Sequence, residues 1–253
     1  MVPAAMTQAP DDTTHFGFRE VPREAKAGLV REVFDSVAGR YDLMNDLMSL
    51  GVHRLWKAAF VHQVAPRAGE RFIDLAGGTG DIAFALGETG AAVTVCDYNE
   101  QMLRQGRKRA ADRALLPGPA WATGDAMALP FAPAVADGVT IAFGLRNVTD
   151  PDRALAEIRR VLKPGGRFFC LEFSRFALPV LDRLYDTYSF EVLPRLGRMV
   201  TGDADSYRYL AESIRKFPPQ ETLAEMMRAA RFGRVGWRNL SGGIAAIHWG
   251  WRT

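Results

Sequence analysis

FIDLAGGTGDIAFAL, residues 72–86, is the stretch that decides the fold. An apolar run ends near Asp74, breaks into glycines and resumes as a helical pattern, which predicts a strand, a tight turn and a helix. Gly78, Gly80 and Ala83 match the dinucleotide-binding spacing G-x-G-x-x-G/A, so a nicotinamide cofactor is one candidate ligand. However, Asp74 and Asp81 flank the turn, and carboxylates beside a pyrophosphate would repel it. A positively charged ligand would suit this turn better.

Strand-like runs and helical patterns alternate outward from this turn. The strand-like runs are residues 71–76, 91–97, 120–125, 137–144, 166–173, 234–240 and 243–251. Helices are expected to begin at Asn99 and at Asp150-Pro151, and LKPGG is expected to form the turn before residues 166–173. Strands separated by helices form a parallel, doubly wound sheet. The last two runs are joined by the turn SGG and must be antiparallel, because a parallel pair needs a long crossover. The sequence therefore predicts an α/β, Rossmann-like fold: a doubly wound, mostly parallel seven-stranded sheet with a C-terminal antiparallel hairpin.

The length of the chain, 253 residues, suits one α/β domain with extensions. We predict a disordered leader at residues 1–15 and a single domain at 16–253. Within that domain, residues 16–65 form an N-terminal helical cap, and 174–210 form an inserted apolar segment on the substrate side.

Composition restricts the class of protein. Hydrophobic residues make up 48% of the chain and charged residues 24%, as in soluble globular proteins. Cys96 and Cys170 lie in strand-like runs, so we expect buried free thiols and a reducing compartment. The first residues lack the features of a secretory signal, and no run reaches the roughly 18 apolar residues of a spanning helix. We expect a cytoplasmic protein; peripheral contact with the inner face of the membrane stays open. The net charge of +3 does not indicate nucleic-acid binding.

Three acids follow the first three strand-like runs. Ligands of doubly wound sheets bind outside the carboxyl ends of the strands, where Asp74, Asp97 and Asp125 lie. Asp97 can bind ribose hydroxyls, and Asp125 can accept a hydrogen bond from an adenine amino group, with the Ala126 N–H beside it. A carboxylate about 4 Å from a cation gains roughly 4 kcal/mol at an effective dielectric near 20. The acids therefore predict S-adenosylmethionine, with S-adenosylhomocysteine as the product. For Asp74 alone, bracing of the loop is the alternative. No spacing typical of a metal site is present.

The segment AFGLRNVTDP, residues 142–151, follows the fourth strand-like run. It lacks the Asp/Asn-Pro-Pro-aromatic sequence of methyltransferases that act on amino groups of nucleic acids. Arg146 stays protonated and cannot act as a base, but it can stabilise a phenolate and lower a phenol's pKa from about 10 by roughly 1 to 3 units. A phenolate passes charge to a ring carbon, which can attack a methyl sulfonium. In the alternative interpretation, Arg146 pairs with an acid such as Asp150 and fixes the loop.

Several long sequence motifs are spread over almost the whole chain. VFDSVAGRYDLMNDLMSLGVHRLWK, DLAGGTGD, FGLRNVTD, LKPGGRFFCLEFS and DADSYRYLAESI together resemble the ubiquinone/menaquinone biosynthesis C-methyltransferase family, from about Phe16 to Trp251. The resemblance implies the S-adenosylmethionine-dependent methyltransferase fold. It also implies methyl transfer to a ring carbon of a polyprenylated quinol, either demethylmenaquinol or 2-methoxy-6-polyprenyl-1,4-benzoquinol.

The resemblance also assigns the site. Donor-binding positions correspond to Thr79 in the glycine turn and to Asp97, Asp125 and Ala126 after the next two strand-like runs. Asp74, Gly78 and Gly80 of the glycine turn belong to the same predicted site. Some members carry Ser where this chain has Ala142, so a hydroxyl contact is missing there. The implied catalytic group is Arg146, Asn147, Tyr41, Asp205 and Tyr207, with Tyr41 and Asn45 facing the quinol ring. Capping or packing roles for Tyr41, Asn45 and Tyr207 stay open. Residues 176–200 could line a polyprenyl tunnel or lie at a bilayer surface, or simply pack in the core.

Two other functions remain as alternatives. A nicotinamide-dependent oxidoreductase would share the glycine turn but would explain neither Asp125 nor the closing hairpin. A non-catalytic methyltransferase-like subunit could scaffold a quinone-synthesis assembly, although the intact acids and the GLRN sequence argue against it. The sequence does not decide between a benzenoid and a naphthalenoid ring. A homodimer and membership of a quinone-synthesis complex both stay open.

Overall fold

The computed structural model describes residues 12–37, 46, 49, 51–175, 190–191, 195 and 204–253. Its centre is a seven-stranded sheet in the order β5-β4-β3-β6-β7-β9-β8. The strands are β3 (Arg71–Leu75), β4 (Ala92–Asp97), β5 (Ala120–Thr123), β6 (Ala136–Ala142), β7 (Leu162–Phe173), β8 (Phe232–Leu240) and β9 (Ala245–Arg252). Neighbouring strands from β5 to β7 are parallel, and β9 is antiparallel to both β7 and β8. The predicted sheet and closing hairpin are confirmed, with β9 between β7 and β8.

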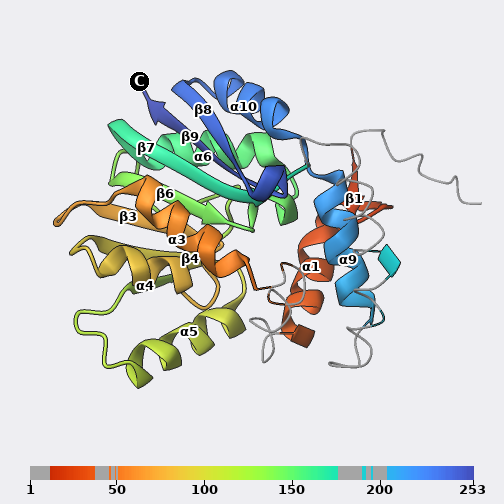
Figure 1. The fold of residues 1–253 in the computed structure, drawn as a ribbon, viewed down its shortest axis with the longest axis horizontal. Coiled ribbons are helices and arrows are strands. Elements are labelled where there is room, and N and C mark those ends of the chain that lie inside the picture. The colour runs from red at the N-terminus through yellow and green to blue at the C-terminus, as the bar shows by residue number, and fades with distance from the viewer. Residues whose placement is uncertain are drawn as a thin grey trace, which may run out of the picture.

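Helices cover both faces of this sheet (Figure 1). They are α3 (His53–Val64), α4 (Asp81–Gly87), α5 (Glu100–Asp112), α6 (Pro151–Val161) and α10 (Gln220–Ala229). Side chains alternate along each strand, so Phe72 of β3 packs in one core with α3 and α4, and Ile73 packs in another with α6 and α10. Cys96 and Cys170 are buried free thiols, as predicted.

Local sequence explains where two of these helices start. The Asn99 side chain accepts hydrogen bonds from the Gln101 and Met102 N–H groups and caps α5. Asp150 caps α6 in the same way, and Pro151 occupies the first turn, where its missing N–H costs nothing. Both starts agree with the sequence prediction. Strand β7 differs, because it begins at Leu162 and includes the LKPGG sequence that we expected to be a turn.

The N-terminal part lies beyond the carboxyl ends of the parallel strands. Strands β1 (Thr13–Phe16) and β2 (Arg19–Pro22) form an antiparallel hairpin, followed by α1 (Arg23–Val37). Helix α9 (Ala204–Lys216) packs beside α1 (Figure 1). The hairpin was not predicted, and β1 begins inside the range expected to be a leader. No helix in the described ranges is long and apolar enough to cross a membrane.

Candidate active site

A cavity of about 250 Å³ opens at the carboxyl ends of β3, β4 and β6. We call it the main cavity because it lies where ligands of doubly wound sheets bind, although larger hollows open elsewhere on the surface. One side comes from the glycine turn and the ends of β4 and β5, and the other from the β6–α6 loop (residues 143–150) and α1. Its lining includes Gly78, Asp97, Asn99, Met102, Asp125, Ala126, Phe143, Gly144, Asn147, Ala27 and Phe34. The structure therefore brings together the sequence-predicted residues Gly78, Asp97, Asp125, Ala126 and Asn147.

Asp97 is the most enclosed acid of the main cavity. It ends β4, and its carboxylate accepts hydrogen bonds from the Gly78 N–H at 2.9 Å and from the Asn99 N–H at 2.8 Å. Burial raises the pKa of Asp97 to about 6, although the hydrogen bonds from these backbone groups act to lower it. Gly78 has a φ of +53°, which favours glycine. Asp97 therefore links the end of β4 to the glycine turn.

Asp125 is exposed at the rim of the same cavity. Its Oδ1 accepts a hydrogen bond from the Met127 N–H at 2.8 Å, which closes a short turn after β5. This turn places Ala126 against the cavity. The Asp125 carboxylate and the Ala126 backbone are thus adjacent, as the sequence prediction requires.

A second, smaller cavity of about 40 Å³ adjoins the main cavity through Ala76, Gly78 and Phe143. Asp74, Thr79 and Ala142 also line it. The Asp74 Oδ1 accepts a hydrogen bond from the Thr140 hydroxyl on the neighbouring strand at 2.8 Å, whereas the buried Oδ2 has no hydrogen-bond partner among the described residues. Burial raises the pKa of Asp74 to about 7, although the Thr140 hydroxyl and the Ala83 backbone N–H act to lower it. A ligand with a hydrogen-bond donor would satisfy Oδ2.

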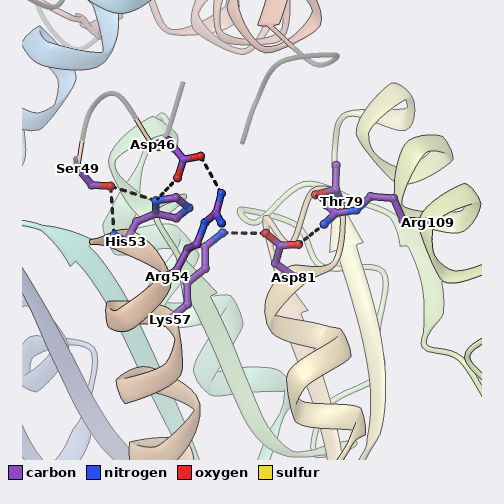
Figure 2. Close-up of polar contacts among 8 residues, drawn as sticks. All are labelled: Asp46, Ser49, His53, Arg54, Lys57, Thr79, Asp81 and Arg109. Atoms are coloured by element: carbon purple, nitrogen blue, oxygen red, sulfur yellow. Dashed lines mark hydrogen bonds and ion pairs between the residues drawn. The ribbon is translucent and has the colours of Figure 1, made fainter. Parts of the chain in front are cut away.

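The glycine turn is braced by two cations that meet at one carboxylate. Figure 2 shows Lys57 from α3 and Arg109 from α5 reaching Asp81, in the first turn of α4, from opposite sides. The distances are 2.8 Å for Lys57 Nζ and 2.7 Å for Arg109 Nη2. Burial opposes ionisation, but the two cations hold the pKa of Asp81 below its ordinary value. Arg109 Nη1 also donates to the Thr79 hydroxyl at 2.5 Å, so this side chain is fixed within the turn.

Arg146 lies in the short helical turn η2 (Leu145–Asn147), but it is not among the residues that line the main cavity. Its Nη1 donates to Glu172 Oε1 at 2.7 Å and to the Phe143 carbonyl at 2.5 Å. The side chain is 2% exposed and that of Glu172 is 1% exposed. The acid suggested from the sequence was wrong, because Asp150 pairs instead with Arg23 at 2.7 Å. Arg146 thus forms a buried ion pair with β7, and its role toward a phenolate stays a prediction.

Asn147 is held in the lining of the main cavity by a residue that sequence reasoning missed. The Tyr209 hydroxyl on α9 donates to Asn147 Oδ1 at 3.0 Å, and the Tyr209 ring stacks on Phe16 with centroids 4.2 Å apart. The next residue, Val148, accepts a hydrogen bond from Lys26 Nζ at 3.0 Å. The available signal was the DADSYRYL sequence, in which we selected Asp205 and Tyr207 instead.

The remaining predicted residues lie elsewhere. Tyr207 is buried in the core, and Asp205 lies exposed beside a groove between α1, α9 and the N-terminal hairpin. Gly80, with a φ of +86°, starts α4. Tyr41, Asn45 and most of residues 176–200 lie outside the described residues. The functional roles of all these residues, the polyprenyl tunnel and the membrane contact stay predictions.

Comparison with known proteins agrees with this geometry. A model of the ubiE/COQ5 methyltransferase family matches residues 20–252. The chain belongs to this family. Among its relatives, the ubiquinone/menaquinone biosynthesis C-methyltransferase UbiE of Acidiphilium cryptum is 60% identical over 98% of this chain. The protein of the same name from Paracoccus denitrificans is 59% identical, again over 98% of this chain. Each match covers 100% of the relative.

Solved structures show the same fold at greater distance. The [4+2]-cyclase SpnF matches with a TM-score of 0.66 and 18% identity, over 88% of this chain and 94% of its own. A phosphoethanolamine N-methyltransferase 2 of Haemonchus contortus, solved with S-adenosyl-L-methionine, matches with a TM-score of 0.54 and 20% identity, over 74% of this chain and 38% of its own. Because one neighbour is named as a cyclase, the fold alone does not define the reaction. Membership of the ubiE/COQ5 family identifies the chain as a methyltransferase.

Proposed function

We propose that this protein transfers the methyl group of S-adenosylmethionine to a ring carbon of a polyprenylated quinol. The acceptor is 2-methoxy-6-polyprenyl-1,4-benzoquinol, demethylmenaquinol, or both. The observation that carries the proposal is the placement of Asp97, Asp125 and Ala126 around one cavity in a chain about 60% identical to a named quinone-biosynthesis C-methyltransferase.

The residues of the two cavities fit S-adenosylmethionine. Asp74 Oδ2 is a buried carboxylate oxygen to which no described residue donates, and an ammonium group would supply a donor. Gly78 has no side chain that would fill the space beside Asp97. A Cβ at this position would lie 3.2 Å from the Met102 methyl group. Asp97 would hold the ribose, Asp125 and Ala126 the adenine, and Asp74 with the small cavity the amino-acid end. When bound, S-adenosylmethionine supplies the methyl group on a positively charged sulfur.

The reaction needs the acceptor in its reduced form. A quinol hydroxyl loses its proton, and the electron pair moves through the ring to the carbon that is methylated. That carbon forms a bond to the methyl carbon as the methyl–sulfur bond breaks and leaves its electron pair on sulfur. The same ring carbon then loses its hydrogen as a proton, and the ring oxygen takes up a proton from solvent. The net products are the methylated quinol, S-adenosylhomocysteine and one proton. The quinone has no hydroxyl to ionise.

The test is methyl transfer from labelled donor to each demethylated quinol, measured with and without a reductant. We expect label in at least one quinol and much less when the quinone is supplied under non-reducing conditions. The matched variant Asp97→Ala should weaken donor binding by about 1.5 to 3 kcal/mol, the range for hydrogen bonds to a charged group. Donor binding without turnover on either quinol would favour a scaffold subunit. Tight NADH binding without S-adenosylmethionine binding would favour an oxidoreductase.

A further inference from the structure

Methyl transfer by the proposed route develops negative charge on a ring oxygen of the acceptor. A site that accelerates the reaction must present a hydrogen-bond donor where that charge forms. Arg146, the cation of the β6–α6 loop, donates to Glu172 and the Phe143 carbonyl, and its buried side chain does not line the cavity. Arg31 of α1 does line the cavity, but its guanidinium lies over the Tyr98 ring. The candidate donors are therefore the other polar side chains of the cavity lining, which include Asn147 of the β6–α6 loop.

Two polar side chains of the β6–α6 loop line the main cavity, those of Asn147 and Thr149. Asn147 is the one whose side chain is held by a hydrogen bond from a described residue, and it lines the cavity together with Asp97 at the end of β4. Its Oδ1 accepts the Tyr209 O–H, whereas its amide nitrogen has no hydrogen-bond partner among the described residues. The amide nitrogen carries two N–H donors. These donors stay free for a ligand as long as the amide keeps its orientation.

Tyr209 is fixed so that it can impose this orientation. Its ring stacks on Phe16 at an interplanar angle of 19°, which restricts where the hydroxyl can lie. Burial raises the pKa of Tyr209 well above its ordinary value, so the hydroxyl keeps its proton and acts as the donor. An O–H donor pairs with the carbonyl oxygen of the amide and leaves the amide N–H groups pointing elsewhere. Lys26 and Thr14 hold the next two residues through the Val148 and Thr149 carbonyls.

We propose that Tyr209 is a positioning residue: it orients the Asn147 amide so that its N–H groups donate to the acceptor oxygen as that oxygen becomes a phenolate. The inference rests on the proposed function and assigns the donor to Asn147 rather than to Arg146. The proton that leaves this oxygen goes to solvent, so neither side chain has to change its protonation state. Tyr209 itself does not touch the acceptor.

The test uses Tyr209→Phe, which keeps the ring stack and removes only the hydroxyl. We expect kcat for quinol methylation to fall about tenfold, whereas S-adenosylmethionine binding by calorimetry changes by less than about twofold. Asn147→Leu should lower kcat about a hundredfold, the range for loss of one donor to an oxyanion. In both variants the apparent pKa of the acidic limb of the kcat–pH profile should rise, because the phenolate is less stabilised.

The double variant separates positioning from general bracing. If Tyr209 acts through the amide, Tyr209→Phe should add little to Asn147→Leu. A Tyr209→Phe effect of the same size in both backgrounds, or an unchanged pH profile, would overturn the inference. Ser213→Ala removes another buried hydroxyl of α9, which among the described residues bonds the Leu210 carbonyl within that helix, and should leave kcat unchanged. Wild-type protein that methylates neither quinol would refute the proposed function and this inference together. An active wild type with fully active Tyr209→Phe would refute the inference alone.

Discussion

The two sides of the main cavity are built in different ways. On the side that we propose binds the donor, called the donor side, Gly78, Asp97 and Asp125 lie at or just after the ends of three neighbouring strands, and each is placed by its own strand and turn. On the side that we propose faces the acceptor, called the acceptor side, the β6–α6 loop is fixed by partners that are remote in the sequence. The partners of Thr149, Val148 and Asn147 lie 135, 122 and 62 positions away in the sequence. They are Thr14, Lys26 and Tyr209, respectively. The donor side is thus a local property of the sheet, and the acceptor side depends on the assembled tertiary structure.

This difference predicts how each side responds to substitution. Changes on the donor side should act mainly on donor binding, because the strands that carry the acids keep their own hydrogen bonds. Changes on the acceptor side should act on stability and turnover together, since each contact also joins distant segments.

The largest effect is expected on the acceptor side, at the buried pair of Arg146 and Glu172. Arg146→Met should destabilise the protein by about 3–5 kcal/mol in chemical denaturation, because it leaves the Glu172 carboxylate buried without its cation. The double variant Arg146→Met with Glu172→Gln should recover much of this stability. If the pair only braces the loop, turnover recovers as well. If Arg146 stabilises the phenolate, turnover stays about ten- to a thousandfold low in the stable double variant.

The next effect concerns pH on the donor side. Burial raises the pKa of Asp74 to about 7 and that of Asp97 to about 6, above roughly 3.9 in an unfolded chain. The folded protein therefore binds protons that the unfolded chain has released, and its stability without donor should fall as pH rises from about 4 to 7. Asp74→Asn should remove part of this decline, on the order of 2–4 kcal/mol at pH 8 relative to pH 5.

Donor binding should show the opposite trend, since a cationic ligand favours the ionised acids. Calorimetry should find tighter S-adenosylmethionine binding at about pH 7.5 than at pH 5.5, with protons released on binding. Asp112→Asn, an exposed substitution on α5, should keep the wild-type pH dependence. Equal donor affinity at both pH values would show that the two acids do not face the cationic end of the ligand.

The smallest of these effects is expected at the Asp81 brace. Asp81→Asn leaves Lys57 and Arg109 without their shared anion and should cost about 1–3 kcal/mol, less than a fully buried pair because all three side chains are partly exposed. Donor affinity should fall only a few-fold, as the glycine turn loosens. Glu221→Gln breaks an exposed pair with Arg228 and should leave the melting temperature unchanged. A similar shift in both variants would mean that the brace does not support the turn.

The same contrast explains how much the sequence could predict. The structure agrees with the predicted features that depend on neighbouring residues. These are the alternating strand and helix patterns, the helix starts at Asn99 and Asp150, and the acids at the strand ends. The hairpin β1–β2, the pairing of Arg146 with Glu172 and the contact of Tyr209 with Asn147 depend on the packing of segments far apart. No spacing in the sequence encodes them, so Asp150 was a reasonable but wrong partner, and Tyr207 was preferred to Tyr209.

The position of β9 affects how the protein folds while it is being synthesised. This strand is the last of the seven in the chain, yet it lies inside the sheet, between β7 and β8. While the chain is still on the ribosome, the open edge of β7 has no partner until residues 245–252 emerge from the exit tunnel. The five parallel strands can assemble during translation, but their apolar edge stays exposed for chaperones or for other nascent chains to bind. A stalled chain that ends before Ala245 should therefore aggregate, even though every residue that lines the main cavity has already been made.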